Sequence, residues 1–427
     1  SSAFSCVAMK VAVIGAGSGG LCAAKHSLEN GLDVVVYEKT DQIGGTWVFR
    51  EDSGKDEYGL DIHSSMYSGL MTNLPKEIMG FPDFPIKGDE TSFLPAERIL
   101  QFHHEYADHF NLRKHIKFQH NVVRVHPHGE SQWEVLVKDL VQDKYSTVIF
   151  DAIFVCNGHF STPSYPDYPG RELYRGRQIH SHAYRSKEIF TGERVLVIGA
   201  GPSGMDFTKD AAKVAEYVVQ CHHWAEQPTV PFPKHVVQKS ADVVRLTEDG
   251  AVFSDGTCEK FTIIAYCTGY KFTFPFISID CGVSVESNYL SPLYQHCINI
   301  NRPTMVFIGI NNYVIAQQMM DLQVRFALKF ITGAMALPPK EEMLASEKYE
   351  ITRRLKKGLS LRKAHFMGPD QGKYFEDLAR IADIKPLPPV LAVLHTEICA
   401  LIRSDILNFR RHNYRLIDEY TFERTTE

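Results

Sequence analysis

The 427-residue chain lacks the features of several large protein classes. Its nine cysteines form no C-x-x-C pair, and their odd number and scatter imply neither a redox dithiol, a zinc site nor a disulfide framework. No run approaches the roughly 18 consecutive apolar residues of a membrane span. The 46 basic and 51 acidic residues give a net charge of −5, and no long basic run could contact phosphates. We therefore expect no metal, no membrane and no nucleic acid as partners.

What is present is the composition of a soluble globular protein, with 44% apolar and 23% charged residues. The length suits about two to three domains. Residues 1–8 precede Met9, which looks like a natural start, so they are either a cloning remnant or the end of a processed secretory signal. The chain has no N-x-S/T sequon, yet a secreted and a cytoplasmic location both stay open.

The first 40 residues carry a dinucleotide-binding pattern. A β-branched run at 10–14 precedes Gly15-Ala16-Gly17-Ser18-Gly19-Gly20, and a helix-like stretch follows. In such a G-x-G-x-x-G turn the glycines allow a tight bend, close approach to a pyrophosphate and close helix packing. The next predicted strand ends at Glu38, which is placed to accept hydrogen bonds from a ribose. An ordinary glycine-rich turn beside a surface glutamate is the alternative, and the complete pattern disfavours it.

The pattern returns at Gly199-Ala200-Gly201-Pro202-Ser203-Gly204, again between a predicted strand and helix. Two such sites suggest one resident cofactor and a second that delivers hydride, which favours a flavin with a nicotinamide. The acid of an NAD site is missing after the following strand, where His222 and His223 stand. This favours NADPH, although neutral histidines supply little charge for a 2′-phosphate. Lys234 or Lys239 would have to fold back, and a plain surface role for both histidines is an equal alternative.

The order of the remaining segments predicts an α/β fold with two Rossmann-like dinucleotide-binding domains, the NADPH domain being inserted into the FAD domain. A strand expected at 147–156 leads into a proline-rich linker at 161–171, and a similar strand at 261–267 leads back. We therefore predict the first part of the FAD domain at 1–161, the NADPH domain at 162–271, and the second part of the FAD domain, with helices at 341–357 and 389–408, at 272–427.

Five segments together resemble the flavin-containing monooxygenases, in particular the short insect type that includes pyrrolizidine-alkaloid N-oxygenases. They are the first turn with Glu38, Lys39 and Gly44-Gly45-Thr46-Trp47; residues 67–85, which contain Thr72 and Asn73; residues 174–184, which resemble F-x-G-x-x-x-H-x-x-x-[YF]; the second turn; and residues 266–270. Gln323 matches a family position near the flavin. The glycine pair at 44–45 also suits either a buried ligand or a tight turn beneath a core tryptophan.

The resemblance implies FAD and NADPH as cofactors and a small amine or sulfide plus O2 as substrates. In the family NADPH reduces FAD, O2 adds at flavin C4a as a hydroperoxide, and a soft nitrogen or sulfur takes the distal oxygen. Asn73 is the implied catalytic residue, because its amide can hydrogen-bond a flavin-bound oxygen; without the match it would be a turn residue. His180 and Tyr184 belong to a signature that is expected to organise the domain junction, and a buried structural role and a contact with the cofactor are equal alternatives for them. We also expect a homo-oligomer.

Three departures from the family pattern affect these expectations. Tyr174 stands where phenylalanine is usual, and Pro202 replaces a common asparagine in the second turn. The histidine pair replaces an arginine after the NADPH-site strand, which leaves NADPH against NADH undecided. For Gln323 a solvated helix position is the alternative, and Phe272, Phe274 and Phe276 suit either a substrate channel or the core.

Other functions remain as alternatives. A Baeyer–Villiger oxygenase usually ends the long signature in tryptophan, where this chain has Tyr184. A disulfide reductase with two dinucleotide sites would need the missing C-x-x-C. A non-catalytic protein that binds a flavin or an alkaloid stays open.

Overall fold

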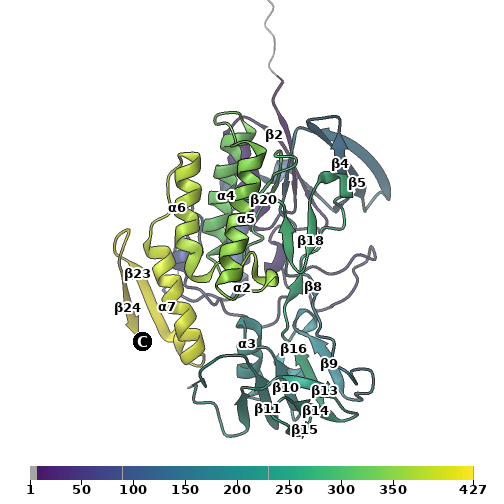
Figure 1. The fold of residues 1–427 in the computed structure, drawn as a ribbon, viewed down its shortest axis with the longest axis vertical. Helices are drawn as coiled ribbons and strands as arrows, with labels where there is room; N and C mark the ends of the chain where they lie inside the picture. Colours follow the sequence, from purple (N-terminus) through teal and green to yellow (C-terminus); the bar gives the residue numbers. More distant parts are fainter. Residues whose placement is uncertain (1–6, 89, 229, 427) are drawn as a thin grey trace, which may run out of the picture.

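The computed structural model describes residues 7–88, 90–228 and 230–426. Of the predicted N-terminal remnant, only Val7 and Ala8 fall inside the described residues. Two largely parallel sheets form the framework (Figure 1). In the described part of the chain, no helix has the length and apolar character needed to cross a membrane.

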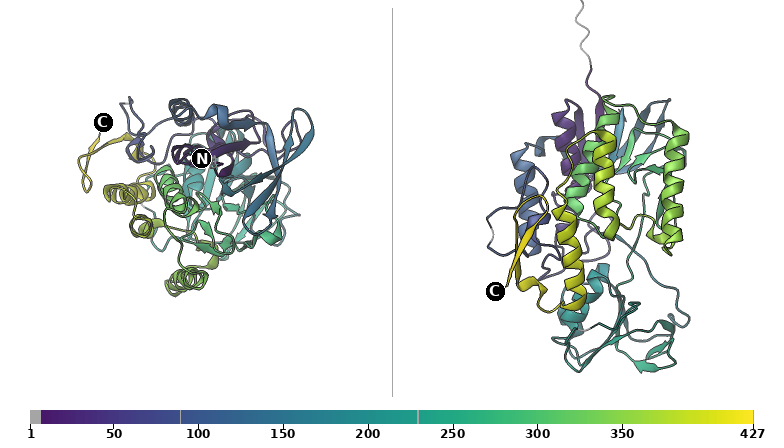
Figure 2. Two further views of the ribbon diagram at one scale, coloured as in Figure 1. Left: turned by 90° about the horizontal axis from the view of Figure 1, so that it is seen from above. Right: turned by 60° about the vertical axis from the view of Figure 1, so that its left-hand side comes forward.

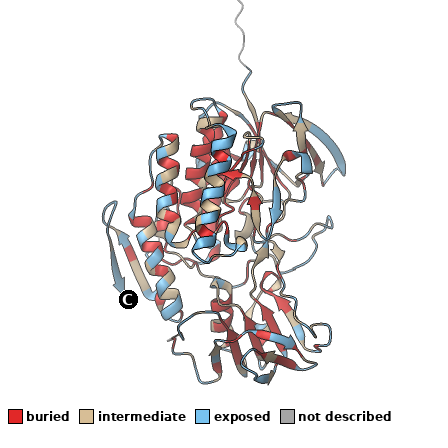
Figure 3. Cartoon of the chain, in the orientation of Figure 1, coloured by how far each residue is buried: buried red, intermediate tan, exposed pale blue. Residues whose placement is uncertain are grey.

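The first sheet has the order β20-β21-β22-β7-β1-β2-β3. Its parallel strands are β1 (Lys10–Ile14), β2 (Asp33–Glu38), β3 (Ile116–Phe118), β7 (Ala152–Val155) and β22 (Met305–Phe307), and the antiparallel β20 (Leu293–Tyr294) and β21 (Ile298–Asn299) extend it. Side chains of β1 alternate between two apolar layers: Val11 and Val13 face a helical core, and Ala12 and Ile14 face the opposite one. Both faces are therefore covered, as Figure 3 shows by the red strands.

The second sheet is parallel throughout and has the order β12-β11-β10-β16-β9. Its strands are β9 (Arg177–His180), β10 (Arg194–Ile198), β11 (Tyr217–Cys221), β12 (Val236–Lys239) and β16 (Ile263–Tyr266). All five lie in sequence between β7 and β20 of the first sheet. The two chain crossings run side by side as the antiparallel pair β8 (Thr162–Pro163) and β17 (Tyr270–Lys271). The predicted α/β fold with an inserted second unit is confirmed, whereas the domain limits at 161/162 and 271/272 stay a prediction.

Helices cover one face of the first sheet and a small sheet covers the other (Figure 2). The helices are α1 (Ser18–Glu29), α2 (Ala96–His109), α4 (Ala316–Ile331), α5 (Lys340–Lys356), α6 (Gln371–Ala382) and α7 (Val390–Ser404), and α3 (Pro202–Ala211) belongs to the second unit. The small sheet consists of β4 (His120–His128), β5 (Gln132–Asp139) and β6 (Lys144–Phe150). The predicted helices at 341–357 and 389–408 correspond to α5 and to a shorter α7.

Three further antiparallel elements complete the fold. They are β13 (Val243–Leu246), β14 (Gly250–Phe253) and β15 (Cys258–Lys260); β18 (Ser284–Glu286) and β19 (Tyr289–Ser291); and the C-terminal hairpin of β23 (His412–Leu416) and β24 (Phe422–Thr426). The hairpin docks on the segment ahead of α2, because Ser92 Oγ accepts a hydrogen bond from the backbone N–H of Tyr414 at 2.7 Å.

The prediction of one strand at 147–156 was wrong, because this stretch contains the end of β6 and the whole of β7. The chain breaks at Asp151, whose backbone N–H donates to the Lys10 carbonyl and whose Oδ2 accepts from the Lys10 N–H, both at 2.7 Å. These bonds turn the chain from β6 into β7 of the first sheet. The three phenylalanines at 272, 274 and 276 all pack in the core with β5 and β22, so the core alternative for this cluster is the correct one.

Candidate cofactor and active site

The first glycine turn is too tightly packed for side chains at two positions. A Cβ on Gly15, whose φ is +102°, would lie 2.5 Å from the carbonyl oxygen of Cys156 at the end of β7. A Cβ on Gly20 would lie 1.7 Å from the carbonyl oxygen of Gly15. The first intrahelical bond of α1 runs from Leu21 N–H to Gly17 O at 3.0 Å. The N–H groups of residues 18–20 therefore have no partner within the helix and are available to an anion.

The glycine pair at 44–45 approaches this same turn. Gly44 N–H donates to the carbonyl of Ala16 at 3.1 Å, and a Cβ on Gly45 would lie 3.2 Å from the Cα of Gly17. A Cβ on Gly44 would lie 2.3 Å from Leu100 of α2. The close approach predicted for the pair is thus an approach to the first turn itself and to α2.

Two side chains fix the shape of the first turn. Glu38 is buried at the end of β2, where its Oε2 accepts from the Ala16 N–H at 2.8 Å and its Oε1 from the Thr40 N–H at 2.9 Å. Oε1 also accepts from Thr40 Oγ1 at 2.9 Å, so Oε2 is the oxygen that keeps a second acceptor position for a ribose hydroxyl. Ser18 Oγ lies 2.6 Å from His103 Nε2, and His103 Nδ1 lies 2.7 Å from the Ile99 carbonyl. Burial lowers the pKa of His103 to about 4, so the neutral ring donates from Nδ1 and accepts the serine proton at Nε2.

Three other predicted residues stand around this turn without a side-chain bond that points to a cofactor. Lys39 Nζ donates to the Asp61 carbonyl at 3.4 Å, and the Thr46 carbonyl accepts from Ser64 Oγ at 2.9 Å. Trp47 is half-buried against the helical core. Their contact with a flavin stays a prediction.

The second turn repeats the geometry of the first. A Cβ on Gly199, with φ +115°, would lie 2.4 Å from the carbonyl oxygen of Cys267, and a Cβ on Gly204 would lie 2.1 Å from that of Gly199. Pro202 is the first residue of α3, where its missing N–H costs no helical bond. Ser203 and Gly204 still present N–H groups to an anion.

Both turns lie where open parallel sheets bind nucleotides. Each follows a central strand, β1 or β10, and leads directly into a helix, so it opens beyond the carboxyl ends of the strands. Backbone takes the space of a Cβ at the first and last glycine of each turn, whereas the space beside Gly17 and Gly201 is open. The helix N-termini also present unpaired N–H groups. The residues present therefore fit a dinucleotide pyrophosphate at each turn.

Asn73 is held by an arginine from the C-terminal segment. Arg410 donates from Nη2 to Asn73 Oδ1 at 2.5 Å and from Nε to the Thr72 carbonyl at 2.9 Å. The same guanidinium lies 3.3 Å from Asp206 Oδ1 on α3. Tyr67 also donates to Asp206, at 2.7 Å. The segment around Asn73 is therefore tied to the helix that begins at the second turn.

The segment is also tied to the first turn, through α2. Thr72 N–H donates to the Leu94 carbonyl at 2.8 Å, and Leu94 N–H donates back to Thr72 Oγ1 at 3.1 Å. Leu94 stands just ahead of α2, whose His103 bonds Ser18 of the first turn. Within the described part of the chain, nothing accepts a hydrogen bond from Asn73 Nδ2, so this donor stays available.

The long signature at 174–184 organises the junction between the two units, as predicted. His180 Nε2 lies 3.0 Å from the Gly269 carbonyl, and its Nδ1 accepts from the His182 N–H at 3.0 Å. Burial lowers the pKa of His180 to about 4, so the ring is a neutral hydrogen-bonding group. His182 Nε2 reaches the Ile62 carbonyl at 2.9 Å, which connects the signature to the first unit.

Comparison with known proteins identifies the family. The model of the flavin-binding monooxygenase-like family matches residues 8–224 and 231–406. The chain belongs to this family. The match confirms the predicted family and its flavin cofactor.

Named relatives of this flavin-binding monooxygenase-like chain act on nitrogen and on sulfur. It is 33% identical to senecionine N-oxygenase of Tyria jacobaeae over 98% of this chain and 92% of the relative. It is 35% identical to flavin-containing monooxygenase FMO GS-OX4 of Arabidopsis thaliana over 89% and 85%. The solved S-allyl-L-cysteine S-oxygenase from Allium sativum superimposes with a TM-score of 0.88 at 29% identity over 95% of both chains.

Gln323 does not have the exposure expected of a solvated helix position. It is 0% exposed on α4, its Oε1 accepts from the Gly309 N–H at 3.0 Å, and its Nε2 donates to Asn311 Oδ1 and Tyr374 OH, both at 2.9 Å. The amide thus joins the segment after β22 to α6. Direct contact with the flavin stays a prediction, and the bonds show a bridging role.

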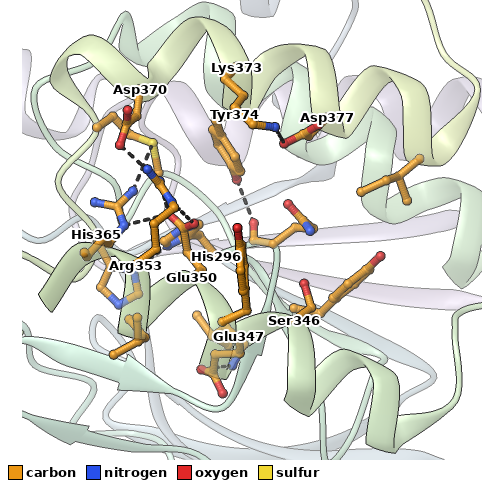
Figure 4. A pocket seen from close by; sticks show the side chains of 18 of the residues that line it. His296, Ser346, Glu347, Glu350, Arg353, His365, Asp370, Lys373, Tyr374 and Asp377 are labelled. Atoms are coloured by element: carbon orange, nitrogen blue, oxygen red, sulfur yellow. Dashed lines mark hydrogen bonds and ion pairs between the residues drawn. The ribbon is translucent and has the colours of Figure 1, made fainter. Parts of the chain in front are cut away.

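A cavity of about 530 Å3 lies between α5, α6 and β20, away from both glycine turns (Figure 4). Its charged side chains pair with one another: Arg353 bonds Glu350 at 2.9 Å and Asp370 at 3.1 Å, and Lys373 bonds Asp377 at 2.7 Å. None of the predicted cofactor residues lines it. We therefore assign the candidate site to the turns and not to this cavity.

Sequence reasoning missed the residues that hold the site together. Arg410, Asp206 and His103 belong to no motif, and each acts on a segment far away in sequence. The Asp206 carboxylate, close after the second turn, was the only one of the three near a recognised pattern.

Proposed function

We propose that this chain uses FAD and NADPH to transfer one oxygen atom of O2 to a soft nucleophilic nitrogen or sulfur of a small molecule, with the tertiary amine of a pyrrolizidine alkaloid as the first candidate. The second oxygen atom leaves as water, and NADPH supplies two electrons. The observation that carries the proposal is the position of Asn73, whose segment is bonded to both nucleotide-binding turns by way of Arg410 and α2.

The names of the relatives support both kinds of substrate atom. The senecionine N-oxygenase, matched over nearly its whole length, favours an amine and an N-oxide product. The sulfur-oxygenating protein with the TM-score of 0.88 favours a sulfide as the second candidate. Both present a lone pair to an electrophilic oxygen, so one site architecture serves either.

The residues of this chain hold and orient the reactants. The first turn and Glu38 would hold the FAD pyrophosphate and ribose, and the second turn would hold NADPH. When bound, the flavin takes electrons from NADPH and activates O2. Arg410 occupies the amide oxygen of Asn73 and leaves Nδ2 as the donor toward the reacting oxygen. No side chain has to abstract a proton from the substrate, which agrees with the neutral, bonded state of His180.

A single assay series tests the proposal. The purified protein should show a flavin absorbance spectrum and should consume NADPH under O2. Adding a pyrrolizidine alkaloid should yield a product heavier by one oxygen atom, and a thioether assayed in parallel separates amine from sulfide preference. No bound flavin would discard the proposal. Flavin and hydrogen peroxide without oxygenated product from any amine or sulfide would favour a non-catalytic flavin-binding or alkaloid-binding protein.

The variant Asn73→Ala tests the proposed role of the Asn73 amide in oxygenation. The variant should keep flavin reduction by NADPH largely intact while forming much less oxygenated product, because it loses the donor to the reacting oxygen together with the Oδ1 acceptor of Arg410. Asn121→Ala, at a half-buried asparagine on β4 away from both turns, is the matched control and should behave as the unmodified protein. A collapse of flavin reduction in Asn73→Ala would assign the residue to nucleotide binding instead.

The Baeyer–Villiger alternative is tested in the same series with a cyclic ketone. Tyr184, which stands where such enzymes usually have tryptophan, is fully buried and donates to Asp210 of α3 at 3.0 Å. Ester formation from the ketone at a rate above amine oxygenation would favour this alternative.

A further inference from the structure

The end of β11 presents a buried hydrogen-bond donor that has no acceptor. His222 follows this strand directly, at the position where an NAD site carries its acid, and it is 2% exposed. Its Nδ1 accepts from the Trp224 N–H at 3.3 Å, which places the ring proton on Nε2. His222 Nε2 has no hydrogen-bond partner among the described residues. His222 is therefore not a plain surface residue, and the Gln227 side chain, which interacts with its ring, is the group that an incoming acceptor would displace.

A cation from the other unit stands over the Trp224 ring, which in turn packs against His222. The Trp224 ring lies 5.1 Å from the His222 ring, and the Arg403 guanidinium carbon lies 5.5 Å from the Trp224 ring centre. Arg403 belongs to the last turn of α7, whose lower end reaches the second unit in Figures 1 and 2. It is exposed and forms no ion pair with a described carboxylate. Its charge is thus available to an incoming anion.

The other nearby cations are engaged or remote. Lys239 Nζ pairs with Asp255 at 3.1 Å and Glu259 at 3.5 Å. His223 lies 3.1 Å from Asp242. Lys234 is exposed, and no contact joins it to the His222 ring or to Trp224. Arg403 of α7 is therefore the best candidate for the cation that would bind an anion at the end of β11.

We infer that Arg403 and His222 together bind the 2′-phosphate of NADPH, the arginine as the cation and the histidine through its Nε2–H. The inference rests on the proposed function for the identity of the coenzyme. The inference explains how the site could bind a 2′-phosphate without an arginine directly after β11. The positive charge would come from α7, about 180 residues later in the sequence and in the FAD-binding part of the chain.

The arrangement predicts a bridging role for the phosphate. The second turn, which would hold the pyrophosphate, belongs to the second unit, whereas Arg403 belongs to the first. Tyr313, whose hydroxyl lies 3.4 Å from a Cβ placed on Gly201, is a further contact from the first unit at the second turn. NADPH would therefore fasten α7 to the second unit, and NADH would not.

Binding of nucleotide fragments tests the inference without catalysis. Adenosine 2′,5′-bisphosphate and 5′-AMP, which lacks the 2′-phosphate, are titrated by calorimetry into the flavin-loaded protein. We expect the bisphosphate to bind about tenfold or more tightly. Arg403→Ala should remove most of this preference while 5′-AMP affinity stays unchanged, Arg403→Lys should keep part of it, and His222→Ala should weaken it. Lys234→Ala is the matched control and should keep it in full.

The outcomes separate this inference from the proposed function. Equal affinity for the two nucleotides, an unchanged preference in Arg403→Ala, or loss of the preference in Lys234→Ala would overturn the inference. The flavin spectrum and the oxygenated product of the unmodified protein test the oxygenase proposal by themselves, so failure of the fragment test leaves that proposal standing. A protein without flavin would instead end the oxygenase proposal.

Discussion

Arg410 Nη2 donates to Asn73 Oδ1 at 2.5 Å across 337 residues of sequence. The bond fixes which end of the asparagine amide is the acceptor, so Nδ2 is left as the donor. The same guanidinium contacts Asp206 of α3, which makes Asn73 sensitive to the position of the second unit. Arg410 is thus a positioning residue for the proposed oxygenation.

Arg410→Ala should uncouple NADPH consumption from oxygenation. We expect the ratio of oxygenated product to NADPH consumed to fall about tenfold, because a charge-assisted hydrogen bond is worth about 1.5–3 kcal/mol. Hydrogen peroxide should rise correspondingly while flavin content stays the same. Product, peroxide and NADPH are measured in one reaction. The neighbouring exposed Arg411→Ala is the control, and equal coupling in both variants would refute the positioning role.

Two glycine substitutions should separate the two nucleotide sites. Gly17 has φ −83° and room for a methyl group, since a Cβ would lie 3.6 Å from the Gly45 Cα. Gly17→Ala should therefore fold with an unchanged thermal midpoint but lose most bound flavin, because the pyrophosphate needs that space. Gly201 has φ −73°, and Gly201→Ala should keep flavin and bind NADPH at least about tenfold more weakly.

The measurements are the ratio of flavin to protein absorbance and the dissociation constant for NADPH. Gly20→Ala is the contrasting case, because its Cβ would lie 1.7 Å from a backbone oxygen, and it should not yield folded protein. Full flavin content in Gly17→Ala would show that the pyrophosphate lies elsewhere.

The glycine turns could be predicted from sequence because their signal is local. A strand, six residues and a helix contain the whole pattern, and the similar strands at 147–156 and 261–267 with the proline-rich linker at 161–171 predicted the inserted unit. Strand ends were less certain: the break at Asp151 depends on its pairing with Lys10, 141 residues away. The apolar residues on both sides of Asp151 give no sign of such a change of sheet.

The contacts between elements could not be predicted in this way. Arg403 and Arg410 look like ordinary basic residues of a polar C-terminal segment, and their roles follow only from the packing of α7 and the C-terminal hairpin beside the second unit. His103 likewise reads as a helical histidine among charged neighbours. Long-range hydrogen bonds of single side chains have no periodicity, so a single sequence carries no signal for them.

His103 should make the protein sensitive to mild acid. Its folded pKa is lowered to about 4 by burial, so on acidification the unfolded chain takes up the proton first, and stability present above pH about 6.5 is lost toward pH 4. The full effect of this residue is about 3 kcal/mol. His103→Gln, which does not titrate, should lose less unfolding free energy between pH 7.5 and pH 4.5 in urea titrations. An identical pH dependence in both proteins would contradict the assignment.

Gln323→Leu should distinguish a bridging residue from a direct flavin ligand. Removal of the amide leaves the Gly309 N–H and Asn311 Oδ1 buried without partners, at about 1–3 kcal/mol for each group. The unfolding free energy of the flavin-free protein should therefore fall by about 2–6 kcal/mol in denaturant titrations, with Gln101→Leu at an exposed position of α2 as the control. A direct ligand would behave differently, because its loss would release flavin and leave the stability of the flavin-free protein unchanged.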